Sequence, residues 1–268
     1  MAKLTRKLWA GIGAASLAGA TFAAPAVAQD HKGHSAPANA AATPDAGGEA
    51  YLTDGGPRDT RIRFYRDIEL MRGHLLVGGQ LIALGLWEEA LPHFLHPTEE
   101  LYGLMEKSIK LHHITPFKRD LQVLAQAVKA KRLGAYQQAL KVVDRRLDGA
   151  LTVAQRFMRP LLKFTVGTAL EVLKSAQSEY EESMEKGRFV KPVEYQDSRG
   201  FVWQAESMFE GAAKDLARVD AASLARIRAD FARLKTAWPA PMPPQAPVLQ
   251  VSEMAALIAD IGQRIARY

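Results

Sequence analysis

Two corner sequences of the same form indicate how this chain folds: Gly-Leu-Trp-Glu-Glu-Ala-Leu at residues 85–91 and Gly-Ala-Tyr-Gln-Gln-Ala-Leu at residues 134–140. Glycine readily adopts the left-handed conformation that ends a helix. The aromatic residue can then fill the corner, and the small alanine lets the next helix pack closely. The two corners therefore predict antiparallel helical hairpins, with each glycine ending a helix.

The rest of the chain also has the spacing of apolar residues that is typical of helices. No stretch shows the sustained alternation of a strand. Pro160 interrupts a long helical pattern and should kink or split it. We predict an all-α fold of antiparallel helical hairpins or bundles, with a Pro-rich strap at 238–248 before the last helix. The helical patterns cover residues 62–76, 121–128, 151–185, 194–218, 221–237 and 251–267.

The first 28 residues have the features of a secretory signal peptide. Three basic residues precede an apolar stretch at 8–24, and Ala26-Val27-Ala28 forms a small-x-small cleavage sequence. Cleavage after Ala28 would leave a chain with no later stretch long enough to span a membrane. We expect a periplasmic or secreted protein.

After this leader, residues 29–57 are rich in small and polar residues and are expected to form a disordered tail. Residues 58–268 are expected to form a single all-helical domain. The net charge of +6 falls to +3 without the three basic residues of 1–28. The chain has no dense basic stripe with interleaved aromatic residues, so nucleic acid is not an expected partner.

The chain has no cysteine, which excludes disulfide bonds, thiolate metal ligands and a cysteine nucleophile. The His-Glu-x-x-His, Glu-x-x-His and Gly-x-Ser-x-Gly patterns are absent, as is a phosphate-binding glycine loop. We therefore predict a protein that is not an enzyme. Any bound metal must be held by histidine, carboxylate or backbone groups.

The densest group of possible metal ligands contains His93, His96, Glu99 and Glu100. Imidazole and carboxylate groups bind iron, copper or zinc. On a continuous helix His93, His96 and Glu100 would share one face. Pro97, however, favours an extended conformation at His96 and the start of a new helix there. The two glutamates would then lie in the first turn of that helix.

The sequence His96-Pro97-Thr98-Glu99, followed by Leu101 and Gly103, resembles the His-x-x-Glu motif of imelysin-like periplasmic proteins. That family is all-helical, exported and linked to iron uptake. The resemblance implies that His96 and Glu99 are metal ligands.

Other candidates lie farther along the chain. His74 stands in an apolar run and would join the site only if its helix packs beside His96. Glu194 and Asp197 are secondary candidates in a polar stretch that could equally begin a helix. The glutamates of 179–185 are interpreted as a solvated acidic face.

The expected mature amino terminus, Gln29-Asp30-His31, offers an alternative site. A free amine, two backbone amides and the imidazole of His31 suit Cu(II) or Ni(II), and His34 could assist. This alternative depends on cleavage after Ala28.

The leading hypothesis is an exported periplasmic metal-binding protein for iron or copper handling. The alternative is an interaction scaffold for a periplasmic protein partner, because the corner at Gly85 and Trp87 also resembles a tetratricopeptide repeat turn. The 49 residues between the two corners differ from that family's period of about 34. This spacing favours ordinary helical hairpins.

Overall fold

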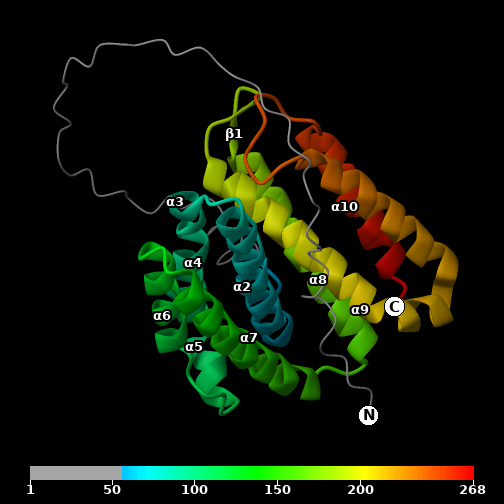
Figure 1. Ribbon diagram of the computed structural model, residues 1–268. Helices are drawn as coiled ribbons and strands as arrows, with labels where there is room; N and C mark the ends of the chain where they lie inside the picture. Colours follow the sequence, from blue (N-terminus) through cyan, green and yellow to red (C-terminus); the bar gives the residue numbers. More distant parts are fainter. Residues whose placement is uncertain (1–55) are drawn as a thin grey trace, which may run out of the picture. The chain divides into compact units, whose positions relative to one another are not determined.

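The computed structural model describes residues 56–268, and its regular structure is almost entirely helical, which confirms the all-α prediction (Figure 1). The leader at 1–28, most of the tail at 29–57, His31 and His34 lie outside the described residues. The helical elements are α2 Thr60–Ala83, α3 Trp87–Ala90, α4 Pro92–His96, η2 Pro97–Leu101, α5 Tyr102–Leu111, α6 Lys118–Lys129, α7 Leu133–Arg156, α8 Leu161–Glu182, α9 Pro192–Leu234, η3 Lys235–Ala237 and α10 Val251–Ile265.

The first corner forms as the sequence predicts. Gly85 has a φ of +80° and follows the end of α2. The ring of Trp87 packs edge-on against Tyr136, with 6.1 Å between ring centroids. The aromatic residues of the two corners therefore contact each other.

The prediction for the second corner is wrong in one respect. Gly134 lies inside the first turn of α7, and the left-handed residue at this corner is Lys131, with a φ of 52°. The corner closes three residues earlier than expected because α6 already ends at Lys129.

Both predicted interruptions of the C-terminal helices are present. Pro160 separates α7 from α8, as a residue without a backbone N–H does at a helix start. Asp220 has extended backbone angles inside α9 and divides it into two helical halves. Its carboxylate accepts a hydrogen bond from the backbone N–H of Ser223 at 2.9 Å, which caps the second half.

Helix α8 pairs with α9 through a short hairpin made of β1, Met184–Glu185, and β2, Arg188–Phe189, whose two strands are antiparallel. Helix α10 packs on both α8 and α9. The Pro-rich segment between η3 and α10 is fixed across this hairpin. The buried Trp238 donates from its indole nitrogen to the carbonyl of Tyr195 at 3.0 Å, and the hydroxyl of Tyr180 donates to the carbonyl of Leu249 at 2.8 Å.

Helix α2 contacts two groups of helices: α3, α4, α5 and α7, which follow it directly in the chain, and the C-terminal helices α8 and α9 (Figure 1). Polar residues carried by α2 can therefore meet residues from both groups. Between residues 56 and 268, no helix combines the length and apolar character needed to cross a membrane.

Candidate metal centre

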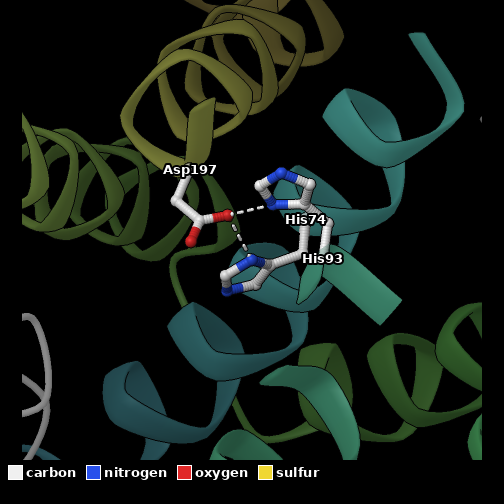
Figure 2. Close-up of side chains that lie close together, drawn as sticks. All are labelled: His74, His93 and Asp197. Carbon is white, nitrogen blue, oxygen red and sulfur yellow. Dashed lines mark hydrogen bonds and ion pairs between the residues drawn. The ribbon is translucent and has the colours of Figure 1, made fainter. Parts of the chain in front are cut away.

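Three buried polar side chains from three different helices meet at one carboxylate oxygen (Figure 2). The Nδ1 atom of His74, from α2, lies 2.6 Å from Oδ1 of Asp197, which belongs to α9. The Nδ1 atom of His93, from α4, lies 2.7 Å from the same oxygen. All three residues are at most 5% exposed. We call His74, His93 and Asp197 the inner cluster.

Two glycines in α2 allow these helices to approach closely enough for the contacts. A Cβ atom on Gly200 of α9 would collide with the backbone carbonyl of Gly73. A Cβ atom on Gly78 would lie 2.6 Å from the ring of Phe94 and 3.2 Å from the Cβ atom of His93. The absence of side chains at these positions brings α9 and α4 against α2. His74 and His93 thereby reach Asp197.

The ring of His93 is fixed by a second contact. Its Nε2 atom lies 2.8 Å from the side-chain oxygen of Gln196, the residue before Asp197. The amide nitrogen of Gln196 in turn donates to the sulfur of Met242 in the Pro-rich segment, at 3.3 Å. Partners of this kind hold the rings of metal-ligating histidines in position.

His96 lies beside the inner cluster, on the other oxygen of the carboxylate. Its Nδ1 atom is 3.3 Å from Oδ2 of Asp197, and its Nε2 atom is 3.8 Å from Glu100. His93, His96 and Glu100 therefore point to one region, as the continuous-helix interpretation expects. Glu99 lies on the same turn but is exposed, and it is not one of the residues grouped around Asp197 in the described structure.

The prediction that Pro97 holds His96 in an extended conformation is wrong. His96 has helical angles, φ −49° and ψ −46°. The chain widens here into a single π-helical turn, Pro97–Leu101, in which the N–H of Tyr102 bonds to the carbonyl of Pro97. This wider turn accommodates a ring that would disrupt an ordinary helix, and π turns of this kind often occur at functional sites.

Burial and charge act in opposite directions at the centre. Burial lowers the pKa of His74, despite the nearby charge of Asp197. Burial would raise the pKa of Asp197, but its interactions with His74 and His93 hold that pKa well below the usual range. Asp197 is therefore ionised at neutral pH. Such a carboxylate, surrounded by imidazoles, is ready to accept a cation.

His96 differs from His74. Burial alone would lower its pKa, but the hydrogen bond to Asp197 and the charges of Asp197, Glu100 and Glu179 outweigh burial and raise the pKa to about 9. His96 therefore carries a proton and a positive charge at neutral pH.

Glu179 also belongs to this region, although the sequence pattern indicates a solvated acidic face for the glutamates of 179–185. In the structure it is half-buried. Burial, together with the charges of Asp197, Glu194 and Glu182, raises its pKa well above the usual value. The helical periodicity of α8 could have separated Glu179 from the exposed Glu181.

The donor atoms suit a transition-metal ion. The ligand atoms of the inner cluster all lie within 4.8 Å of one another. For bonds of about 2.1 Å, neighbouring ligands of one ion lie roughly 3.0–3.4 Å apart. The hydrogen-bonded atoms, at 2.6 and 2.7 Å, need to separate by only about 0.3–0.8 Å to admit the ion.

The C-terminal part of the chain matches a known family. Residues 159–268 match the sequence model of the iron permease-associated 4-helix bundle domain, over less than half of the chain. The description of that family names an association with iron permeases, whereas the resemblance to imelysin-like proteins is not confirmed. Comparison with curated proteins and with solved structures gave no match.

The matched residues contain only part of the centre. Asp197 and Glu179 lie within 159–268, whereas His74, His93 and His96 precede it. The helical bundle therefore contributes carboxylates, and the N-terminal helices add the imidazoles.

Proposed function

We propose that this chain is an exported metal-binding protein that serves iron handling and has no enzymatic activity of its own. His74, His93 and Asp197 hold the ion. The observation that carries the proposal is the meeting of two buried imidazole nitrogens at one ionised carboxylate oxygen, at 2.6 and 2.7 Å.

The energetics of burial support this assignment. A carboxylate and two imidazoles in a dry environment are costly to bury unless they are paired or coordinate a metal. The packing of α2 on α9 does not require three buried polar side chains from three separate helices. A cation neutralises Asp197 and replaces the protons on the two Nδ1 atoms, so binding releases protons and weakens as the pH falls.

The family match of the bundle, rather than the ligand types alone, favours iron among the candidate metals. A set of imidazole and carboxylate donors suits iron, zinc or copper(II), whereas copper(I) prefers sulfur. The family match of the bundle supports iron. Copper or zinc in place of iron remains an outcome that the titration below detects.

The proposed location follows from the sequence at 1–28, which has the pattern of a signal peptide ending at Ala28. In the periplasm the metal ion would be the ligand of this protein. A membrane permease is the protein partner that the matched family's description suggests.

The test is a metal titration of the purified chain with Fe²⁺ without oxygen, and with Cu²⁺ and Zn²⁺, followed by elemental analysis. We expect tight binding by the wild type and a large loss in His93→Asn. His113→Asn is the matched control, because His113 is exposed and has a φ of 53°, which asparagine tolerates. Wild type that binds no metal would refute the proposal and leave the interaction scaffold as the working hypothesis.

The tail alternative is tested in the same experiment. A full-length His31→Ala/His34→Ala variant should bind iron as the wild type does. Loss of metal in this variant, with His93→Asn unaffected, would move the site to the tail.

A further inference from the structure

The Pro-rich segment is attached to α9 directly beside the candidate metal centre. Tyr195 holds two of its residues, because its carbonyl accepts from the indole nitrogen of Trp238 at 3.0 Å and its hydroxyl donates to the carbonyl of Ala240 at 3.0 Å. The next residue of α9, Gln196, donates from its amide nitrogen to the sulfur of Met242 at 3.3 Å. Two consecutive residues of α9 therefore hold three alternate residues of the segment.

The sequence of the segment fixes where the sulfur of Met242 lies. Each of the three alternate residues precedes a proline, at 239, 241 and 243. Proline fixes its own φ and restricts the residue before it to extended angles. The far end of the segment is held where the carbonyl of Leu249 accepts from the hydroxyl of Tyr180. Met242 is therefore presented to Gln196 by a stiff segment, although Met242 itself is 37% exposed.

The contact with Met242 decides which way the amide of Gln196 faces. A thioether sulfur accepts hydrogen bonds but cannot donate them, so the NH₂ end of the amide turns toward the sulfur. The oxygen end then faces His93, whose Nε2 atom lies 2.8 Å from it. A flipped amide would place two acceptors, oxygen and sulfur, against each other and turn the NH₂ group toward the ring.

A metal ion at the inner cluster requires this orientation of the amide. A neutral imidazole that binds a metal through one nitrogen carries its hydrogen on the other. The Nδ1 atom of His93 faces Asp197 and would bind the ion, so Nε2 would carry the hydrogen and need an acceptor. The oxygen of Gln196 is that acceptor. Partners of this kind fix the tautomer of a ligating histidine and make it a better ligand.

We propose that Met242 and Gln196 are positioning residues that couple the Pro-rich segment to the affinity of the metal centre, by holding His93 in the tautomer that binds an ion through Nδ1. This inference rests on the proposed function, because it concerns the regulation of the same site. A partner that draws the segment away from α9 would remove the sulfur, release the amide of Gln196 and weaken metal binding. The position of a surface segment thereby controls how firmly a buried ion is held.

The test is a titration of the full chain with Fe²⁺ without oxygen, in the His31→Ala/His34→Ala background, which removes any binding by the tail. Met242→Leu keeps the size of the side chain and removes the acceptor. We expect its affinity for Fe²⁺ to fall about tenfold, at the lower end of the range for partners that orient a ligating histidine. The matched control is Met184→Leu, which makes the same change at a partly buried methionine in β1 and should leave the affinity unchanged.

A second background separates the orientation of the amide from simple packing. Gln196→Glu replaces the amide by a carboxylate, which presents an oxygen to His93 whichever way it turns. In this background Met242→Leu should change the affinity by less than about twofold, because the two substitutions act on the same contact. A packing role for Met242 predicts the same loss in both backgrounds, so equal losses would overturn the proposal.

Histidine ¹⁵N NMR of the Zn²⁺-loaded background protein locates the ring hydrogen of His93 without depending on how a variant folds. The proposal predicts the hydrogen on Nε2 and the ion on Nδ1. An ion on Nε2, or unchanged Fe²⁺ affinity in Met242→Leu, would overturn the proposal while leaving the proposed function intact. No metal binding by the background protein would overturn the proposed function itself. Circular dichroism of the metal-free proteins checks that each variant folds.

Discussion

His74 in α2 and Asp197 in α9 are 123 positions apart in the sequence, yet their side chains meet at 2.6 Å. They meet beside the point where the backbones of Gly73 and Gly200 are in contact. The candidate metal centre and the crossing of α2 with α9 are therefore one structural feature. A substitution that separates the helices should also disperse the ligands.

The first prediction concerns this crossing. Gly200→Ala places a methyl group against the backbone carbonyl of Gly73, which cannot move without shifting α2. We expect a loss of stability of about 1–3 kcal/mol, as is usual for overpacking, together with weaker metal binding. Urea denaturation and metal titration measure the two effects.

Gly211→Ala is the control for that substitution. Gly211 lies in the same helix, and a Cβ atom there meets no other atom within 4 Å. Alanine should stabilise the helix by about 0.5–1 kcal/mol and leave metal binding unchanged. Equal effects of the two substitutions would contradict the close approach at Gly200.

The second prediction concerns the charge of Asp197. Asp197→Asn keeps the shape of the side chain but removes the negative charge that the imidazoles surround. We expect the metal-free protein to lose about 3 kcal/mol of stability, in the range found when one partner of a buried charged pair is removed. The variant should also lose the rise in melting temperature that added Fe²⁺ gives the wild type. Thermal unfolding with and without Fe²⁺ tests both, and equal metal stabilisation of the two proteins would argue against Asp197 as a ligand.

The third prediction concerns pH. The pKa of His96 is about 9 in the folded chain, above the ordinary value of 6.5, because Asp197, Glu100 and Glu179 face it and outweigh the effect of burial. The folded state therefore binds this proton more tightly than the unfolded state does. The stabilisation is complete below pH 6.5 and is lost as the pH rises to about 9.

Urea denaturation of metal-free protein between pH 6.5 and pH 9 measures this stabilisation. The wild type should lose more stability over this range than His96→Gln, which has no proton to release. Parallel curves for the two proteins would show that His96 does not carry the effect. Metal binding should show the opposite trend, strengthening as the pH rises, because the ion competes with protons at this centre.

The fourth prediction concerns the break in α9. The carboxylate of Asp220 caps the second half of the helix at the N–H of Ser223. Asp220→Ala should cost about 1 kcal/mol, as is typical for a lost helix cap. Asp215→Ala, which removes only an exposed ion pair with Arg218, should cost less than about 0.5 kcal/mol. Chemical denaturation compares the two variants, and metal binding should be unchanged in both.

Local patterns in the sequence were sufficient to predict the fold. Helical periodicity and the proline at 160 act within a few residues of their own position, so their effects can be read from short stretches. The corner at Gly134 was placed three residues too late, because the left-handed residue there is Lys131, a residue type with no preference for that conformation.

The centre was only partly predictable. His93, His96 and Glu100 are close in sequence, so a helical turn brings them together. His74 and Asp197 depend on contacts between distant helices, which a single sequence does not reveal. The conformation of His96 was mistaken because an α-helix was assumed after Pro97, whereas the chain forms a wider turn. Glu179 was overlooked because acidic residues near a helix end are usually solvated.

The contact between α2 and α9 gives the ion a further role in a chain that has no cysteine. A metal bound between His74 and Asp197 would close a loop of more than a hundred residues. A covalent cross-link around a loop of that length removes unfolded-state entropy worth roughly 4–5 kcal/mol. The ion would thus do for this protein what a disulfide bond does for others. Unlike a disulfide, this cross-link forms only when metal is present, so the rigidity of the chain would report whether the protein is loaded.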